Sequence, residues 1–237
     1  MHLLRARTLV SLIAALLAAV LLASCSSDTP HDRTITLTFI RHGESEANAA
    51  GGVIDTSVPG PSLTPTGEQQ AAAAANRLKS NGYDGVYASQ MVRTQQTAAP
   101  MAKALGKQVT VLPGLDEISA GWFDGGNVKN AAATYMVAPA DWLRGDTDFA
   151  IPGSVSGAEF NGKFTGGAVQ KIYESGNNKP VAFSSAASIM LWTLMNARNA
   201  KDSLATDHPL PNTGRVVVTG NPVIGWTLVD WDGITSF

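Results

Sequence analysis

The residues best equipped for chemistry form one short stretch, Arg41-His42-Gly43-Glu44, with Asn48 close behind it. An arginine binds phosphate oxygens with a two-pronged guanidinium, and a histidine offers a nucleophilic ring nitrogen near neutral pH. A glycine lets the backbone approach a bound group closely, and we expect Gly43 to do so. The combination predicts a phosphate site built on His42.

The elements around this stretch predict how it is held. A β-branched run at 34–38 precedes it and indicates a strand, and open α/β sheets place ligand sites beyond the carboxyl ends of strands. Further strands are expected at 84–88, 108–112, 179–183, 214–219 and 225–231, and helices at 64–78, 90–104 and 186–197. We therefore predict an α/β fold, a three-layer sandwich with a mainly parallel sheet, helices on both faces and an antiparallel edge made by the last two strands.

The remaining segments are less regular. We expect a helix over 130–143 with a break near Pro139, and another over 157–174 that three glycines weaken. The segment 49–61 is rich in Gly, Pro and small polar residues, which predicts a loop. Because it directly follows the Arg41-His42 stretch, this loop is expected to border the site.

Composition limits the classes of partner. The chain has 237 residues, of which 44% are hydrophobic, and a formal net charge of −2. No basic stripe is visible, so nucleic acid is not an expected partner. One cysteine is present, which excludes an intrachain disulfide. These features are typical of one globular domain.

The N-terminus has the pattern of an export signal. Arg5 and Arg7 precede an apolar run that ends in Leu22-Ala23-Ser24-Cys25. Small residues before a cysteine look like a bacterial lipobox, in which a peptidase cuts before the cysteine and acyl chains such as palmitate are attached to it. We predict a lipoprotein signal peptide at 1–24, a tether at 25–33 and a folded domain at 34–237, anchored to the extracytoplasmic face of the cell membrane through Cys25. The alternative is an ordinary signal peptide.

Four stretches in a fixed order carry a family resemblance. They are Arg41-His42-Gly43-Glu44 with Asn48, the segment 63–71 around Thr64-Pro65-Thr66-Gly67-Glu68, Tyr87-Ala88-Ser89 with Arg93-Thr94 and Thr97-Ala98, and Leu115-Asp116-Glu117 with Gly121 and Asp124-Gly125. Together they resemble the histidine phosphatase superfamily, which includes the cofactor-dependent phosphoglycerate mutases. The resemblance implies a histidine-phosphatase-like domain over 34–237.

The resemblance also implies a role for each matched residue. His42 is the expected nucleophile, which forms a phosphohistidine, and Arg41 and Arg93 are expected to bind the phosphate oxygens. Glu117 stands where this family often keeps the proton donor for the leaving oxygen, and Asn48 is expected to add a neutral hydrogen bond. The substrate or partner implied is a phosphorylated small molecule or a phosphoprotein. Neither a metal nor a cofactor is implied, since phosphoryl transfer chiefly asks a protein for positioning and positive charge.

One position departs from the family pattern. The family's second histidine normally follows the strand at 179–183, and Ser185 stands there instead, followed by Ala186 in place of glycine. A serine at a helix start is still expected to contact phosphate, but its neutral hydrogen bond is roughly half as strong as a charged one. Losing one transition-state stabiliser typically slows a reaction about a hundred- to a thousandfold. His208 is the one other candidate imidazole, in a proline-rich loop where an exposed position is expected.

Two interpretations therefore remain open. The first is an extracytoplasmic phosphomonoester hydrolase that works through phospho-His42 at a reduced rate. The second is a degenerate phosphatase that binds a phosphorylated ligand or partner without turnover. A mutase is less favoured, because glycolytic substrates are cytoplasmic. The segments 49–61 and 127–152 carry few charges, which argues against a highly anionic substrate.

Overall fold

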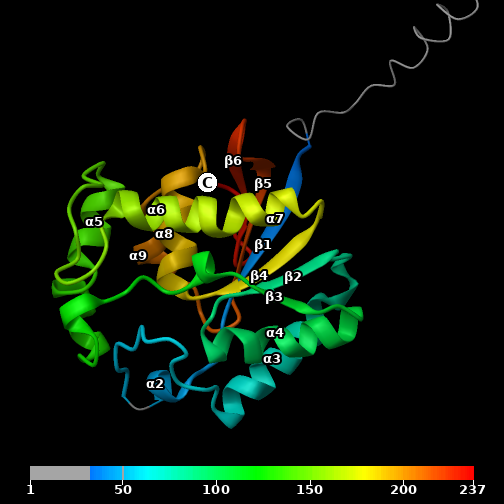
Figure 1. Cartoon of the computed structure of the whole chain (residues 1–237), viewed down its shortest axis with the longest axis horizontal. Helices are drawn as coiled ribbons and strands as arrows, with labels where there is room; N and C mark the ends of the chain where they lie inside the picture. The colour runs from blue at the N-terminus through cyan, green and yellow to red at the C-terminus, as the bar shows by residue number, and fades with distance from the viewer. Residues whose placement is uncertain (1–32, 50) are drawn as a thin grey trace, which may run out of the picture. The chain divides into compact units, whose positions relative to one another are not determined.

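A six-stranded sheet runs through the part of the chain that the structure describes, in the order β3-β2-β4-β1-β5-β6 (Figure 1). The structure is a computed structural model and describes residues 33–49 and 51–237. The strands are β1 (Ile35–Arg41), β2 (Gly85–Ala88), β3 (Val109–Val111), β4 (Pro180–Ser184), β5 (Arg215–Asn221) and β6 (Gly225–Trp231). The first four are parallel, whereas β5 pairs antiparallel with both β1 and β6. The predicted α/β class, with its antiparallel edge, is confirmed.

Helices cover both faces of the sheet. One face packs against α3 (Pro65–Leu78) and α4 (Val92–Leu105), and the other against α6 (Gly157–Phe164), α7 (Gln170–Glu174) and α8 (Ala186–Asn196) (Figure 1). Shorter helices lie in connections: α2 (Glu46–Ala49), α5 (Val137–Leu143) and α9 (Ser203–Asp207). The expected start of α3 is confirmed, because the Thr64 side chain accepts a hydrogen bond from Gly67 N at 3.0 Å as its N-cap.

Alternation along the strands builds two apolar layers. In β1, Phe39 points into the layer under α6 and α8, while Ile40 points into the layer under α3 and α4. The Phe39 ring lies 5.3 Å from that of Trp192 and 5.6 Å from that of Phe164, centroid to centroid. Residues 37–40 of β1 are all buried, as is typical of a strand that helices cover on both faces. This burial makes β1 a rigid support for the residues that follow it.

The helix expected over 130–143 is wrong in its details. A 3₁₀ helix occupies Val128–Ala133, and α5 begins only at Val137. The break falls at residues 134–136 rather than at Pro139, which lies in the first turn of α5. A proline is tolerated in a first turn because the N–H groups there have no partner within the helix.

The helix expected over 157–174 contains a π-helical turn, Thr165–Val169, between α6 and α7. This turn packs against the loop after β3. A Cβ built on Gly114 would lie 2.5 Å from the carbonyl carbon of Gly167 and 2.7 Å from Ala168 N, closer than real Cβ contacts allow. Glycine at position 114 therefore permits a backbone contact that holds the following segment, residues 115–117, against the helices.

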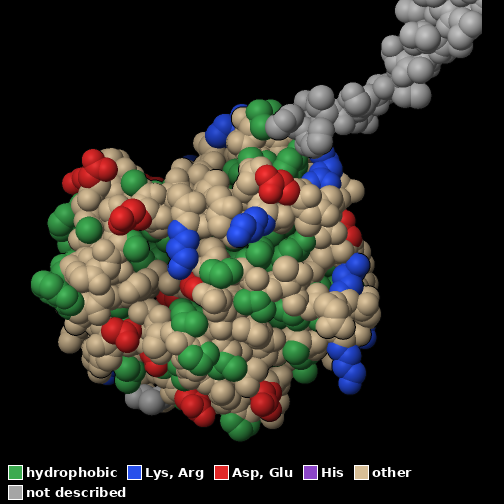
Figure 2. All heavy atoms as spheres, in the orientation of Figure 1, with side chains coloured by type: hydrophobic (Ala, Val, Ile, Leu, Met, Phe, Trp, Pro, Cys, Tyr) green, Lys and Arg blue, Asp and Glu red, His purple; other side chains and the backbone are tan. Residues whose placement is uncertain are grey.

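Residues Thr34–Phe237 form one compact unit. The predicted signal peptide, Cys25 and the tether up to residue 32 lie outside the described residues. Over the described ranges, none of the helices combines the length and the apolar character needed to span a bilayer. Acidic and basic side chains are both scattered over the face shown in Figure 2, in keeping with the near-neutral net charge.

Candidate active site

A cavity of about 250 Å³ opens at the carboxyl ends of the parallel strands. Arg41 is the last residue of β1, Arg93 lies in the first turn of α4 after β2, and α8 begins directly after β4. The polar and charged residues that line the cavity are Arg41, His42, Ser45, Asn48, Asp55, Thr56, Arg93, Glu117 and Tyr135. The structure thus brings together Arg41, His42, Asn48, Arg93 and Glu117, and the loop after β1 borders the cavity as expected.

His42 is held with one ring nitrogen available. Its Nδ1 lies 2.7 Å from Gly43 O, and because a carbonyl oxygen only accepts, Nδ1 carries the proton. Nε2 is then the unprotonated nitrogen, and it accepts a 3.2 Å hydrogen bond from Arg93 Nε. Burial, and then the positive charge of Arg93, lower the pKa of the imidazole to about 3. His42 is therefore neutral near pH 7, and its unprotonated Nε2, which accepts the hydrogen bond from Arg93, is the nucleophilic nitrogen of the ring.

The His42 backbone is also fixed. His42 N donates to Ser184 O at 3.0 Å, which ties the end of β1 to the end of β4. His42 O accepts a 3.0 Å hydrogen bond from Asn212 Nδ2. These contacts connect the nucleophile to the sheet and to the loop before β5.

Two guanidinium groups, of the half-buried Arg41 and the buried Arg93, line the cavity with His42, and their hydrogen-bond donors are only partly satisfied. Arg41 Nη1 donates to Leu210 O at 2.7 Å, and Arg93 Nη2 donates to Asp55 O at 3.2 Å. Arg41 Nε and Arg93 Nη1 are buried without a hydrogen-bond partner among the described residues. Burial lowers the pKa of both groups, and the negative charge of Glu117 opposes that shift. Buried unpaired donors are costly, so this pair is suited to an oxygen-rich anion.

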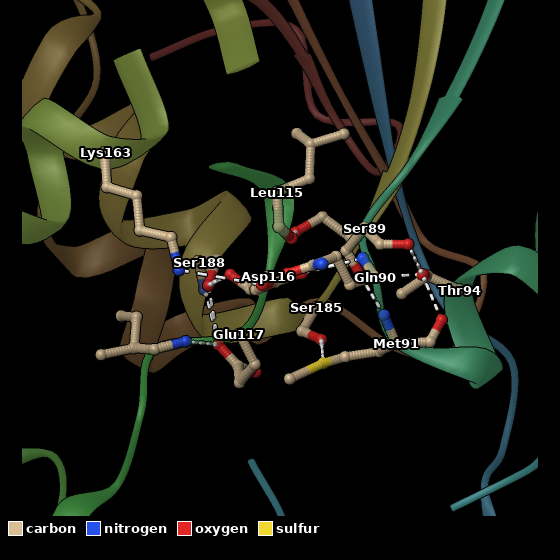
Figure 3. Close-up of polar contacts among 12 residues, drawn as sticks. Ser89, Gln90, Met91, Thr94, Leu115, Asp116, Glu117, Lys163, Ser185 and Ser188 are labelled. Atoms are coloured by element: carbon tan, nitrogen blue, oxygen red, sulfur yellow. Dashed lines mark hydrogen bonds and ion pairs between the residues drawn. The ribbon is translucent and has the colours of Figure 1, made fainter. Parts of the chain in front are cut away.

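Glu117 has one oxygen fully engaged and one available. Its Oε1 accepts from Ile118 N at 3.0 Å, from Ser188 N at 3.1 Å and from Ser188 Oγ at 2.8 Å (Figure 3). Ser188 lies in the first turn of α8, so the helix start holds this carboxyl group. Oε2 receives no hydrogen bond within the described ranges, and Glu117 lines the cavity. Oε2 is thus the oxygen placed to exchange a proton with a ligand.

The neighbouring Asp116 has a different position. It is buried, does not line the cavity, and its carboxylate accepts from Gln90 N at 2.8 Å and lies 3.7 Å from Lys163 Nζ (Figure 3). Burial raises the pKa of this carboxyl, and the contacts with Gln90 and Lys163 oppose the change. Asp116 O also accepts from Ser188 Oγ at 3.0 Å. Asp116 therefore connects the segment after β2 with α6 and α8 and does not face a ligand.

The structure does not bring Ser185 into the cavity. Its side chain is fully buried, and its hydroxyl points to Met91 Sδ at 4.0 Å (Figure 3). The methyl groups of Ala186 and Ala187 line the cavity instead. His208 is exposed and does not line it either. In the described part of the chain, His42 is the only imidazole at the cavity.

The role of Gly43 differs from the one expected. A Cβ on Gly43 would lie 2.6 Å from Gly67 O, so this glycine allows close packing against the start of α3 rather than the approach of a ligand. Glu44 supports the same contact, since its carboxylate accepts a 2.7 Å hydrogen bond from Thr64 Oγ1. The loop that carries His42 is therefore locked to α3.

Several residues of the site carried no clear signal in the sequence. Ser188 is a helix residue whose partner, Glu117, lies 71 positions away in the chain. Tyr135 is buried and donates to Ile118 O at 2.7 Å, and burial raises its pKa well above the usual value. Thr97 belongs to a stretch that carries the family resemblance, but its contact was not predicted: its hydroxyl accepts from Gly43 N at 3.0 Å and braces the His42 loop from α4. Contacts of this kind depend on chain segments that meet only in the folded protein.

Comparison with known proteins agrees with this geometry. A model of the histidine phosphatase superfamily (branch 1) matches residues 37–232. The PE-PGRS family protein PE_PGRS11 of Mycobacterium tuberculosis is 49% identical over 218 residues, which cover 85% of this chain and 37% of that protein. The chain spans only 37–42% of the length of this and the next two curated relatives.

Solved structures share the fold. A protein described as mycobacterial hydrolase 1 has a TM-score of 0.69 at 20% identity, over 86% of this chain and 100% of that one. A mutant of phosphoserine phosphatase from Entamoeba histolytica, in complex with phosphoserine, has a TM-score of 0.66 at 25% identity, over 84% of this chain and 96% of that one.

Proposed function

The chain belongs to the histidine phosphatase superfamily, and from this premise we propose that it hydrolyses phosphomonoesters through a phosphohistidine on His42. One observation carries the proposal: the unprotonated Nε2 of a neutral His42 shares one cavity with the guanidinium groups of Arg41 and Arg93, each of which has a buried nitrogen without a hydrogen-bond partner among the described residues. A nucleophile and the positive charge needed to stabilise a transferring phosphoryl group therefore occupy the same cavity.

The first half of the reaction forms the phosphohistidine. The substrate phosphate binds Arg41 and Arg93, and the Nε2 lone pair attacks phosphorus. The ester P–O bond breaks, and its electron pair leaves with the alcohol oxygen. That oxygen takes a proton from Glu117 Oε2, while Nδ1–H of His42 remains bonded to Gly43 O. Glu117 must enter this step protonated, because a carboxylate has no proton to give.

The second half releases phosphate. Glu117, now a carboxylate, accepts a proton from a water molecule while the water oxygen attacks phosphorus. The P–N bond breaks and its electron pair returns to Nε2. Inorganic phosphate leaves, and Glu117 is again protonated for the next cycle. The three donors at Glu117 Oε1 keep the carboxyl oriented through both steps.

The test is to trap the intermediate. Wild-type protein treated with a radiolabelled phosphomonoester and quenched in alkali should carry an acid-labile, alkali-stable label, and His42→Asn should carry none. Arg77→Ala, a change at an exposed arginine, is the matched control and should label as wild type does. No label and no phosphate release over a broad set of esters and pH values would refute the proposal.

A second candidate is a protein that binds a phosphorylated ligand without turnover. The burial of Ser185 favours it, because no second imidazole faces His42 in the described part of the chain. Ser185→His combined with Ala186→Gly separates the two candidates, with folding checked by thermal unfolding. A large gain in activity would mean that the natural protein is impaired, and comparable activity before and after would exclude the degenerate form.

We also propose that Cys25 is lipidated and holds the domain at the extracytoplasmic face of the membrane. The support is the position of the cysteine after the small-residue end of the apolar run. Metabolic labelling with a palmitate analogue should mark the wild type and not Cys25→Ala, and the variant should leave the membrane fraction. A label that persists in Cys25→Ala would contradict this assignment.

A further inference from the structure

The cavity above His42 has apolar walls. Aliphatic side chains from three separate segments line it: Val53 and Ile54 from the loop after β1, Val128 and Met136 from the segment before α5, and Ala187 and Met190 from α8. The neutral polar lining residues, Ser45, Asn48, Thr56 and Tyr135, bring no charge for a second ionic group, and the aliphatic side chains offer no hydrogen bonds. They favour an apolar group on the ligand, because burying apolar surface away from water is favourable.

The charges in the cavity give the same indication. Among the described residues that line it, Arg41 and Arg93 are the only cations, and the proposed mechanism assigns both to the phosphate. The other charged lining residues, Asp55 and Glu117, are acids. A carboxylate or second phosphate on the substrate would meet two acids and no further cation, which penalises its transfer from water.

We propose that the site selects phosphomonoesters of apolar, uncharged alcohols, such as medium-length alkyl or aryl phosphates, over esters that carry a second anionic group. This inference rests on the proposed phosphate site at His42. It follows from the combination of aliphatic walls and the absence of a third lining cation in the described ranges. Each methylene that enters the cavity should raise kcat/KM about fourfold until the walls are filled.

The test compares alkyl esters, so that the leaving groups are matched. For wild-type protein, kcat/KM should rise at least about tenfold from methyl to hexyl phosphate. The kcat/KM values for O-phosphoserine and 3-phosphoglycerate should be at least about tenfold below that for hexyl phosphate. One unfavourable charge contact of about 1.4 kcal/mol lowers kcat/KM tenfold. A flat alkyl series, or a preference for either anionic ester, would overturn the inference.

A charge variant sharpens the test. Val128 lines the cavity and is 50% exposed, so Val128→Lys can place an ammonium at the cavity without burying it. We expect it to raise kcat/KM for 3-phosphoglycerate and to lower that for hexyl phosphate. Val229→Lys, at a 42% exposed valine of β6 that does not line the cavity, is the control and should change neither value. Equal effects of the two variants would count against the assigned specificity.

Binding distinguishes failure of this inference from failure of the proposed function. If no ester is hydrolysed, the affinities of wild-type protein for inorganic phosphate, hexyl phosphate and 3-phosphoglycerate are measured by calorimetry. Tightest binding of hexyl phosphate would support the specificity and refute the hydrolase. Binding of phosphate with no gain from the hexyl chain would overturn the specificity and leave the anion site standing. If none of the three binds, both proposals fall.

Discussion

Arg93 Nε donates a 3.2 Å hydrogen bond to His42 Nε2. The arginine that we propose binds the phosphate therefore contacts the proposed nucleophile directly. The lone pair needed for attack is engaged by this contact. A phosphate oxygen is a stronger acceptor for a guanidinium than an imidazole nitrogen, because the hydrogen bond joins opposite charges. Binding of substrate is therefore expected to draw Arg93 away from Nε2 and free the nucleophile in the same event.

The first prediction concerns the protonation of His42. A histidine in an unfolded peptide gains its proton at about pH 6.5. Burial and the adjacent Arg93 lower the pKa of His42 to about 3, so its ring should stay neutral from pH 8 to pH 5. The ring resonances, assigned by their loss in His42→Asn, should not shift over that interval in NMR spectra of the free protein. A transition centred near pH 6.5 would contradict the prediction.

The second prediction is the effect of this shift on stability. Between pH 6.5 and about 3, the unfolded chain binds a proton at His42 that the folded protein does not. The free energy of unfolding should therefore fall as the pH falls through this interval, by roughly a few kcal/mol in total. Urea unfolding at several pH values measures it. His42→Asn removes the group and should show a shallower decline, while equal slopes for the two proteins would exclude this contribution.

The third prediction concerns Arg93. Arg93→Ala removes a cation from the phosphate site together with the hydrogen bond to His42 Nε2. We expect kcat/KM for a phosphomonoester to fall about a hundred- to a thousandfold, as is typical when one transition-state donor is lost. The exposed Arg77→Ala should leave the rate within about twofold. A loss below about fivefold in Arg93→Ala would show that Arg93 does not hold the transferring group.

The fourth prediction concerns Ser185. Its hydroxyl faces Met91 Sδ rather than the cavity, so Ser185→Ala should change KM and kcat by less than about twofold. The affinity for inorganic phosphate, measured by calorimetry, should also be retained. A tenfold weaker affinity would instead support the direct phosphate contact that the position of Ser185 in sequence indicates.

The fold was largely predictable from sequence because its signals are local. β1 is rich in β-branched and apolar residues, β4 is almost continuously apolar, and Thr64 with Pro65 marks the start of α3. The position of Arg41 and His42 at a strand end was also predictable. The burial of Ser185 was not, because it depends on Met91 from another segment of the chain. The break before α5 was misplaced because the proline signal is the same whether a helix begins or ends nearby.

The last prediction distinguishes two roles for Glu117: a proton donor to the leaving oxygen, and a carboxyl group that only maintains the structure of the site. If Glu117 Oε2 gives its proton to the leaving oxygen, Glu117→Gln should slow alkyl phosphates about a hundredfold or more and p-nitrophenyl phosphate much less, because nitrophenolate leaves without a proton. Ser188→Ala removes the 2.8 Å hydrogen bond to Oε1 and should reproduce this pattern more weakly, as a positioning effect. Ser203→Ala, in the exposed start of α9, is the matched control and should affect neither ester. Equal losses for both esters in Glu117→Gln would show that the carboxyl maintains the site and does not transfer the proton.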